Sequence, residues 1–443
     1  MSNQPESLLR TYKKRVNQLL SEPWRSSANH WPAAVSELFK KKSVFLALTA
    51  KHLTPFYVFD QRALQADIIG FKKAFSRFLP KSEYFYAVKV NHYPEVLKEV
   101  LKHGFGLDVS SSRELKMGLK HGAKKMVFSG PGKTAADLAL AVRQRQKVIV
   151  NIDNFSELKR LGEIAQAQRR KINCGVRIYT QYHGVWHKFG IALADLKKFW
   201  QQAKKYPYLN LQGIQFHLSL NYSALPYQNV IKELAKYLRR HFSPSELQQI
   251  KFIDFGGGFM PHLSEGVYSH FTPRGKIIKT ANDYFQKPSV FKDKYYFTKT
   301  ATAAEFAQGI AAAVNKHLKP LVSCVYFAEP GRIIANSAMH ILLRVVDVKD
   351  KENVVVDGGI NIVGHERYEE DYFPIINLTR PAKKEIDCRV WGPLCLPDDY
   401  WGYYVYAAAM KEGDYLLVPS QGCLTYALAQ EFIKPIPPVH LLK

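Results

Sequence analysis

The sequence contains few cysteines and no long apolar run. The five cysteines among 443 residues are too few and too scattered for a disulfide framework or a zinc ribbon; they are Cys174, Cys324, Cys388, Cys395 and Cys423. Eighteen consecutive apolar residues occur nowhere, which excludes an ordinary membrane-spanning helix. The first residues also lack the apolar core of a secretory signal. We therefore expect a reduced, cytoplasmic protein without a membrane partner.

Common metal and nucleotide motifs are missing as well. The chain has no H-E-x-x-H, no C-x-x-C and no paired acidic calcium loop, so we expect no metal site. Gly132-Lys133-Thr134 resembles the end of a phosphate-binding P-loop, but that motif needs a glycine where Val127 stands. An ATPase is therefore not expected.

Acidic residues are scarce in the first two thirds of the chain. The net charge is +25, and residues 1–300 hold 49 basic and 21 acidic residues, against 14 and 17 in residues 301–443. Such a charge is compatible with nucleic acid, a membrane or an anionic small molecule. The basic residues recur along predicted helix faces, as at Lys116, Lys120 and Lys124, and do not form one arm. This pattern favours a solvated basic surface over nucleic-acid binding, with attraction of an anionic substrate as an intermediate possibility.

Regular alternation of strands and helices begins after residue 80. Apolar, β-prone runs start near Tyr84, Phe105, Met126, Lys147, Asn173, Gln212, Ile250 and Leu321, and the first four starts are each 21 residues apart. Helical stretches lie between them. Eight such units predict a closed (β/α)8 barrel of the TIM type, with an open doubly wound sheet as the alternative.

The flanking segments differ from the barrel in pattern. Residues 1–55 are predicted to form a helical extension and a lead-in strand, because residues 7–20 place apolar side chains on one helical face. The barrel is expected over 56–335, with an insertion or lid at about 259–300. Short β-prone runs separated by turns predict a second, mainly antiparallel β domain over 336–443.

Polar residues follow most of the predicted strands. In a (β/α)8 barrel the chemistry lies at the carboxyl ends of the strands. Those positions hold Lys89, Asp108, Arg177, His217, Gly256, Gly257, Gly258, Glu329, Gly331 and Arg332. A desolvated lysine there can form a Schiff base, although a buried ion pair would be the better explanation of Lys89 if it stood alone. Similarly, the glycines can approach a phosphate or simply make a turn, and Glu329 and Arg332 can bind a ligand or each other.

Taken together, these residues resemble the fold-type III pyridoxal-phosphate decarboxylases, the group of ornithine, arginine-type and diaminopimelate decarboxylases. The resemblance spans about Phe56 to Phe432. It is carried by Tyr86-Ala87-Val88-Lys89-Val90-Asn91, Gly106-Leu107-Asp108-Val109-Ser110-Ser111, Lys188-Phe189-Gly190, Phe216-His217, Asp254-Phe255-Gly256-Gly257-Gly258-Phe259, Glu329-Pro330-Gly331-Arg332 and Trp391-Gly392-Pro393-Leu394-Cys395. The joint order of these motifs is far more specific than any one of them.

The resemblance implies an alanine racemase-like barrel, pyridoxal 5'-phosphate as cofactor and a role for each matching residue. Lys89 would carry the cofactor, His217 would stack on its ring, and Asp108 and Arg177 would line its site. Gly256–Gly258, Gly331 and Arg332 would hold the phosphate. Glu329 would keep the ring nitrogen protonated, which favours decarboxylation, whereas alanine racemases set an arginine there.

The family also implies a homodimer with shared active sites. Cys395 would reach in from the second subunit and return a proton to the carbon that loses carbon dioxide. A lone cysteine is more often a small buried hydrophobe, so this role depends on the preceding Gly392-Pro393-Leu394.

Several positions depart from the family pattern. Decarboxylases of diamino acids usually have an acidic residue directly after the cysteine, where this chain has Leu396; Asp399 stands where a further acid binds substrate. The phosphate-contacting tyrosine of Gly-Ala-Tyr is Leu424 here, and Tyr426 lies two residues later. After Asp357-Gly358-Gly359-Ile360-Asn361, the run Val363-Gly364-His365-Glu366-Arg367-Tyr368 also differs from the diaminopimelate decarboxylase pattern.

These departures are similar to a side branch that decarboxylates conjugated amino acids in carboxylate-siderophore synthesis. The expected function is thus decarboxylation of a conjugated, carboxylate-bearing amino acid such as a citryl-diamino acid. The alternatives are diaminopimelate decarboxylase and a non-catalytic, decarboxylase-like binding protein.

Overall fold

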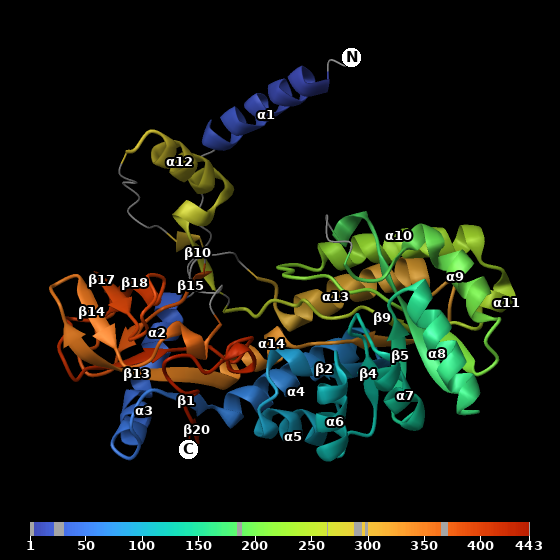
Figure 1. Ribbon diagram of the computed structural model, residues 1–443, viewed down its shortest axis with the longest axis horizontal. Helices are drawn as coiled ribbons and strands as arrows, with labels where there is room; N and C mark the ends of the chain where they lie inside the picture. The colour runs from blue at the N-terminus through green and yellow to red at the C-terminus, as the bar shows by residue number, and fades with distance from the viewer. Residues whose placement is uncertain are drawn as a thin grey trace.

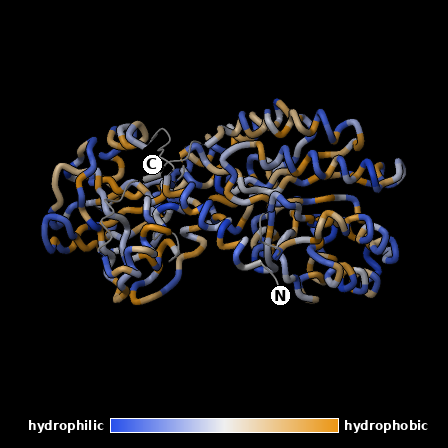
Figure 2. The backbone as a smooth tube through the Cα atoms, turned by 90° about the horizontal axis from the view of Figure 1, so that it is seen from above, coloured by the Kyte–Doolittle hydropathy of each residue, from blue (hydrophilic) through white to orange (hydrophobic). Residues whose placement is uncertain are grey.

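The chain forms two lobes that lie side by side (Figures 1 and 2). The computed structural model describes residues 4–21, 31–183, 188–263, 265–287, 295–296, 300–364 and 371–442. One lobe is a closed barrel surrounded by helices, and the other is built around a separate β-sheet. Among the described helices, none combines the length and apolarity that a membrane crossing requires.

Eight parallel strands close the barrel. They are β2 (Ser82–Ala87), β3 (Gly106–Val109), β4 (Met126–Phe128), β5 (Val148–Ile152), β6 (Ile172–Tyr179), β8 (Leu209–Gln215), β9 (Phe252–Asp254) and β12 (Val325–Ala328). They follow this order around the barrel, with β5 paired to β6 and β12 paired to β2, and the two-residue β7 (Ile191–Ala192) adds to β6. The prediction of a closed barrel with these eight strands is confirmed.

Helices connect the strands around the outside of the barrel. They are α4 (Gln61–Phe78), α5 (Pro94–Lys102), α6 (Ser112–Lys120), α7 (Ala135–Arg143), α8 (Phe155–Ala167), α9 (Leu196–Ala203), α10 (Leu225–His241), α11 (Pro244–Leu247) and α13 (Ala303–Ala313). Side chains of Ser111, Thr134 and Asn154 cap α6, α7 and α8 by accepting a backbone N–H three residues on. Because each cap fixes where a strand-to-helix loop ends, it also fixes the loops at the carboxyl end of the barrel.

Aromatic side chains fill the amino-terminal half of the barrel interior. Phe252 and Phe327 stack there with ring centroids 4.6 Å apart. Gly213 makes room for them, because a Cβ at that position would lie 1.9 Å from the Phe252 ring. This end is therefore a packed core, and the polar residues of the interior gather at the opposite end.

The second lobe contains an eight-stranded mixed sheet. Its strands are β1 (Phe56–Phe59), β13 (Met339–Val348), β14 (Asn353–Val356), β16 (Ile376–Asn377), β17 (Glu385–Trp391), β18 (Tyr400–Tyr406), β19 (Tyr415–Val418) and β20 (Val439–Leu441). Five of the pairings between these described strands are antiparallel and three are parallel. The predicted mainly antiparallel domain is thus present, and the short helix α14 (Arg332–Ala335) leads into it from the barrel.

Residues 56–59 lie in this second sheet, so their assignment to the barrel was wrong. Phe56 pairs antiparallel with Leu342, and Tyr57 pairs parallel with Val439. All four residues are buried between neighbouring strands. An apolar run of this kind predicts a buried strand but not its partners, and here both partners come from the C-terminal part of the chain.

The segments at the N-terminus and after β9 form smaller elements. Helices α2 (Trp31–Lys40) and α3 (Lys42–Thr49) pack Val35 and Phe45 onto the second sheet. A three-stranded sheet joins β10 (Gly266–Tyr268) to β11 (Tyr295–Tyr296) and β15 (Asp371–Tyr372). The predicted helix at 7–20 is α1 (Gln4–Ser21), which contacts α12 (Pro273–Tyr284) and stands away from the lobes (Figure 1). Residues 288–294 and 297–299 of the expected insertion lie outside the described residues.

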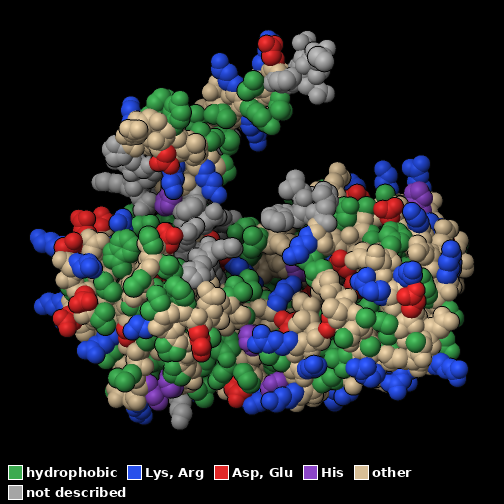
Figure 3. Space-filling model, in the orientation of Figure 1, with side chains coloured by type: hydrophobic (Ala, Val, Ile, Leu, Met, Phe, Trp, Pro, Cys, Tyr) green, Lys and Arg blue, Asp and Glu red, His purple; other side chains and the backbone are tan. Residues whose placement is uncertain are grey.

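Lysine and arginine side chains are dispersed over the barrel lobe. On the face in Figure 3 they occur along its whole lower and outer border, with hydrophobic and acidic side chains between them. This distribution on the visible face is that of a solvated basic surface.

Candidate active site

Lys89 lies at the carboxyl end of the first barrel strand. It follows β2 in a single 3-10 turn, Val88–Val90, between two buried valines. The backbone N–H of Leu424 donates to the Val90 carbonyl at 2.9 Å, which ties the turn to the second lobe. The charge of Lys89 acts on Asp108 and His217. Lys89 thus lies at the polar end of the barrel, and its side chain is exposed in the single chain.

Three buried acidic residues meet at this end of the barrel. Asp108, Asp254 and Glu329 end or follow β3, β9 and β12, and each is at most 1% exposed. Burial, followed by repulsion from Glu329, raises the pKa of Asp108 to about 7. Burial and the charge of Glu329 also raise the pKa of Asp254 well above its usual value, so the fold favours protonated Asp254. The second Glu329 neighbour is Gln215, whose amide lies 3.4 Å from Oε1.

His217 is a neutral side chain beside the Glu329 carboxylate. Its Nδ1 accepts the backbone N–H of Gly257 at 3.1 Å and lies 3.5 Å from Glu329 Oε2. Burial and the nearby charges of Lys89 and Arg177 hold its pKa well below the usual range. A neutral imidazole whose ring is fixed by a backbone donor suits stacking on a flat cofactor and does not suit an ion pair.

The glycine triplet forms a turn that no larger residue can adopt. Gly256 and Gly258 have φ of +67° and +88°, in the left-handed region. A Cβ at Gly257 would lie 2.5 Å from the Glu329 carbonyl oxygen, and one at Gly258 would lie 1.7 Å from the Leu218 carbonyl oxygen. The backbone thus comes close to both neighbouring strands, and the N–H groups of Gly256 and Gly257 donate to Asp254 and His217.

Arg177 and Asp108 line the opposite side of the site. Arg177 lies over the Phe189 ring, with 4.4 Å between the guanidinium carbon and the ring centroid. Ser129 donates to Asp108 Oδ1, whereas Asp108 Oδ2 and Gln215 Oε1 are buried acceptors without a partner among the described residues. A molecule with N–H or O–H groups bound here would satisfy both acceptors.

Arg332 lies at the start of α14, next to Gly331. A Cβ at Gly331 would lie 2.5 Å from the Val90 side chain, so this glycine lets the Lys89 turn and α14 approach each other. Arg332 forms an ion pair with Glu265. The alternative left open by the sequence, a pair between Glu329 and Arg332, is not formed: Glu329 lies beside His217 and Gln215.

These features together fit the cofactor that the sequence pattern implies. The site offers an amine (Lys89), a neutral flat ring (His217), a buried carboxylate (Glu329), a glycine turn and a cation (Arg332). These are the groups required to bind an aldehyde, an aromatic ring, a ring nitrogen and a phosphate. The sequence did not identify Gln215, Asp254 or Phe189 as functional, although Gln215 and Asp254 end β8 and β9; Phe189 lies in the loop between β6 and β7.

Cys395 lies apart from this cluster, in a loop of the second lobe. It is exposed and, within the described part of a single chain, it makes no hydrogen bond or ion pair with the barrel residues. Asp399, predicted to bind substrate, is 1% exposed and accepts the backbone N–H of Leu394 at 2.6 Å and that of Ile360 at 2.8 Å. This geometry favours a positioning role for Asp399. Residues 365–368 lie outside the described residues.

Lys133 of the P-loop-like segment is a buried structural residue. Its Nζ lies 2.7 Å from Glu157 Oε1 and 2.9 Å from the Asn151 carbonyl oxygen, and neither charged side chain is exposed. Thr134 caps α7 in a capping box with Asp137, so it too has a structural contact. In the described residues, no group of three or more histidine, cysteine or acidic side chains is arranged to hold a metal ion.

Comparison with known proteins gives a match over most of the barrel. The family model "Pyridoxal-dependent decarboxylase, pyridoxal binding domain" matches residues 65–336. A diaminopimelate decarboxylase of Aquifex aeolicus is 25% identical over 412 residues, covering 89% of this chain and 88% of the other. The L-glutamyl-BtrI acyl-carrier protein decarboxylase of Niallia circulans is 24% identical, covering 90% of both chains.

Solved structures agree on the fold. A variant of Helicobacter pylori diaminopimelate decarboxylase complexed with L-lysine has a TM-score of 0.72 and is 24% identical. It covers 90% of this chain and 94% of its own. The two-lobed architecture is therefore shared over nearly the whole length of both proteins.

Proposed function

The chain belongs to the pyridoxal-dependent decarboxylase family and is a pyridoxal-phosphate-dependent amino-acid decarboxylase; from this premise we propose that its substrate is a conjugated amino acid that bears a carboxylate. A citryl-diamino acid of the kind used in carboxylate siderophores is the proposed example. The proposal concerns the distal end of the substrate, because the chemistry at the α-carbon is common to the family.

The loop around Cys395 carries this proposal. The position directly after Cys395 is Leu396, which cannot pair with an ammonium group. Asp399 is buried and both of its oxygens already accept backbone N–H groups. Leu396 and the buried Asp399 therefore offer no carboxylate to a free distal ammonium, which leaves the exposed Asp398 as the acid of this loop, whereas an amide- or ester-linked distal group needs none.

The charge of the chain supports an anionic substrate. The excess of basic residues lies in residues 1–300, which include the whole glycine turn and Arg177. A basic surface raises the local concentration of anions and their association rate. The relative that acts on a glutamyl group carried by an acyl-carrier protein offers a precedent for a conjugated substrate within the family.

In this proposal each residue has a physical task. When bound, the cofactor withdraws electrons from the substrate α-carbon. Lys89 would hold the cofactor through its amine, Glu329 would hold a proton on the ring nitrogen, and neutral His217 would cover one face of the ring. Arg177 and Asp108 would line the site. Cys395 of a second copy would return a proton to the α-carbon, which requires a homodimer.

Diaminopimelate decarboxylase is the second candidate. Seven of eight similar curated proteins carry that name at 24–26% identity, and they align over nearly the whole chain. Its substrate also carries a distal carboxylate, which suits the basic charge, but it adds a distal ammonium for which Leu396 offers no partner.

Carbon dioxide release from purified protein distinguishes these candidates. We expect a kcat/KM at least about tenfold higher for a citryl-diamino acid than for diaminopimelate, since one charged hydrogen bond differs. Turnover of diaminopimelate alone would exclude the conjugated substrate. If no amino acid is turned over and no band of lysine-bound cofactor appears, the chain is instead a non-catalytic binding protein.

A further inference from the structure

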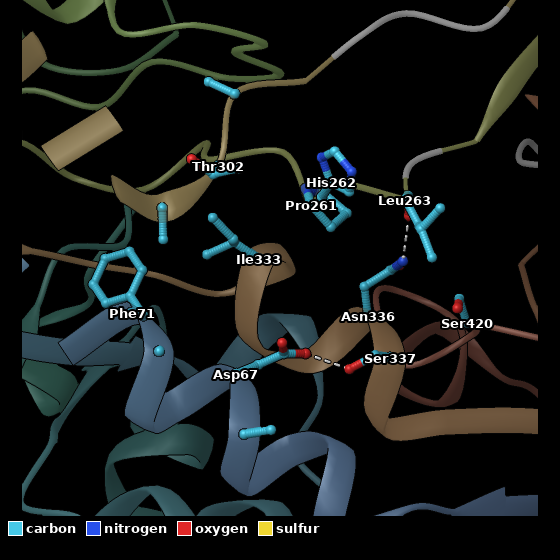
Figure 4. Close-up of a pocket in the computed structure, with 14 residues that line it drawn as sticks. Asp67, Phe71, Pro261, His262, Leu263, Thr302, Ile333, Asn336, Ser337 and Ser420 are labelled. Atoms are coloured by element: carbon cyan, nitrogen blue, oxygen red, sulfur yellow. Dashed lines mark hydrogen bonds between the residues drawn. The ribbon is translucent and has the colours of Figure 1, made fainter. Parts of the chain in front are cut away.

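A cavity of about 270 Å³ lies beside the cofactor site (Figure 4). It is lined by α4, by the segments 261–263 and 301–303, by α14 with the turn after it, and by Ser420. Pro261 closely follows the glycine turn and Ile333 follows Arg332, but none of the described residues assigned above to the cofactor site lines this cavity. The cavity is therefore a separate space next to that site.

Asp67 gives the cavity a negative charge. It is half-buried on α4, and the Ser337 hydroxyl donates a hydrogen bond to one of its carboxylate oxygens, Oδ2 (Figure 4). Among the described lining residues there is no lysine, no arginine and no second acidic residue, and His262 is the other titratable group. Burial, partly offset by Ser337, raises the pKa of Asp67 to about 6, so the carboxyl group is ionised at pH 8. In a chain with a net charge of +25, this cavity thus prefers a cation.

The side chain of Asn336 strengthens that preference. It is 4% exposed and donates its amide N–H to the Leu263 carbonyl at 3.1 Å (Figure 4). The backbone carbonyl of Asn336 accepts the N–H of Gly422 at 3.0 Å, so the residue is fixed in place. Its amide oxygen, Oδ1, is buried and accepts no hydrogen bond from the described residues. The negative end of this dipole is therefore uncompensated in the wall that also carries Asp67.

The helix terminus at another wall of the cavity does not reverse the preference. Thr302 caps α13, and the Glu305 carboxylate accepts the Thr302 backbone N–H at 2.7 Å and its hydroxyl at 2.9 Å. Thr302 Oγ1 in turn accepts the backbone N–H of Glu305 at 3.2 Å. The positive end of this helix is thus met by an acidic residue of its own first turn.

Gly70 leaves the cavity open. It lies in the middle of α4, where a glycine destabilises a helix relative to alanine. A Cβ at Gly70 would meet no atom within 4 Å, so close packing does not explain the absence of a side chain. The apolar side chains of Phe71 and Ile333 line the same space (Figure 4). The cavity therefore combines one buried negative group with an apolar wall, which suits a positive charge attached to a short aliphatic chain.

We propose that this cavity binds a small protonated aliphatic amine, whose N–H donates to Asp67 and whose chain packs against Phe71 and Ile333. The site is separate from the cofactor site and selects a cation, whereas the proposed substrate is anionic. The inference therefore goes beyond the proposed function and does not rest on it.

Calorimetric titration of the holoenzyme at pH 8 tests this site. The probe is N,N-dimethylbutylamine, which is protonated at this pH and whose tertiary nitrogen cannot react with the cofactor aldehyde. Asp67→Asn is expected to weaken its binding by about 10- to 100-fold, the loss of a hydrogen bond to a charged group. Gly70→Leu is expected to abolish binding, because the new side chain occupies the cavity. Hexanoate, an anion of similar length, should not bind to the wild type.

Two exposed positions provide matched controls. Asp347→Asn, in β13 of the other lobe, removes a carboxylate far along the chain from the cavity. Ile69→Leu changes an exposed side chain of α4 that does not line the cavity. Both variants should bind the probe as the wild type does.

Each result either supports or overturns the inference. If the wild type does not bind the probe, or binds it no more tightly than Asp67→Asn does, the inference is overturned. Binding that persists in Gly70→Leu would mean that the amine binds elsewhere and overturns it as well. If Asp67→Asn does not fold, Gly70→Leu gives the answer, since leucine favours a helix more than glycine does. None of these measurements depends on decarboxylation, so failure of this site is distinguishable from failure of the proposed function.

Discussion

Asp399 Oδ2 accepts the backbone N–H of Leu394 at 2.6 Å, directly before Cys395 in the chain. Its other oxygen accepts the N–H of Ile360, so one buried carboxylate connects two segments of the second lobe. Gly392 makes this possible, because a Cβ there would lie 2.2 Å from Asp399 Oδ2. The loop that presents Cys395 therefore depends on a residue that does not itself reach the solvent.

Replacing Asp399 by alanine should destabilise the protein and slow turnover without weakening cofactor binding. Two backbone N–H groups lose their acceptor, and each buried unsatisfied donor costs about 1–3 kcal/mol. The measurements are the free energy of unfolding in urea, kcat, and the dissociation constant of pyridoxal phosphate.

The exposed neighbour Asp398 supplies the control. Asp398→Ala should leave all three quantities unchanged, since no ion pair or buried contact is lost. An unaltered unfolding free energy in Asp399→Ala, combined with a raised KM, would restore direct substrate binding as the role of Asp399.

Lys89→Ala should abolish the visible absorbance of the lysine-bound cofactor and the incorporation of label from borohydride. The charge of Lys89, which directly follows β2, acts on Asp108 and His217, and alanine has no nucleophile. Lys116→Ala, on the exposed face of α6, is the matched control and should behave as the wild type. A yellow Lys89→Ala protein that still takes up label would show that another lysine carries the cofactor.

The apoprotein should lose stability as the pH rises from 6 to 8. The folded-state pKa of Asp108 is raised from 3.8 to about 7, so the protonated form is favoured in the fold. The stabilisation by protonated Asp108 is fully present below the pKa that this group has in the unfolded chain. It is lost as the pH rises through the pKa of the group in the folded protein. Asp108→Asn should flatten this part of the curve, measured by urea unfolding at several pH values.

An exposed aspartate tests whether the effect is specific. Asp347→Asn, in β13, should keep the wild-type dependence on pH. If Asp108→Asn and Asp347→Asn give the same slope between pH 6 and 8, ionisation of Asp108 does not destabilise the fold.

Much of the barrel could be predicted from the sequence because its strands are short, apolar and evenly spaced. Each predicted strand start lies close to the observed one, as for Tyr84 in β2 and Met126 in β4. The partner of Phe56–Phe59 could not be predicted, since strand pairing over almost 300 residues leaves no trace in local pattern. Helix α4, which leads from that strand to the barrel, was missed although Leu64, Ile68 and Phe75 stand at helical spacing.

The site could be predicted where a residue ends a strand, as at Lys89, Asp108 and Glu329. It could not be predicted where the role depends on a neighbour from a distant segment. Glu265 meets Arg332 across 67 positions of sequence, and Asp399 meets Ile360 across 39. For Asp399 the same residue type supports both substrate binding and loop anchoring, and only burial distinguishes the two.

Removing the buried cation beneath the site should strongly destabilise the barrel. Lys133 and Glu157 form an ion pair with both side chains fully buried, and loss of one partner leaves an uncompensated charge that costs about 3–5 kcal/mol. Burial already raises the pKa of Glu157, so the loss of unfolding free energy in Lys133→Met should be smaller at pH 5, where the carboxyl group can protonate, than at pH 8.

Lys133→Met/Glu157→Leu should recover most of the stability, because two apolar side chains need no partner. Lys159→Ala, which breaks an exposed pair at 3.9 Å, should cost less than about 0.5 kcal/mol. Urea unfolding of the four proteins measures these differences, and a Lys133→Met variant as stable as Lys159→Ala would show that the buried pair contributes nothing to the fold.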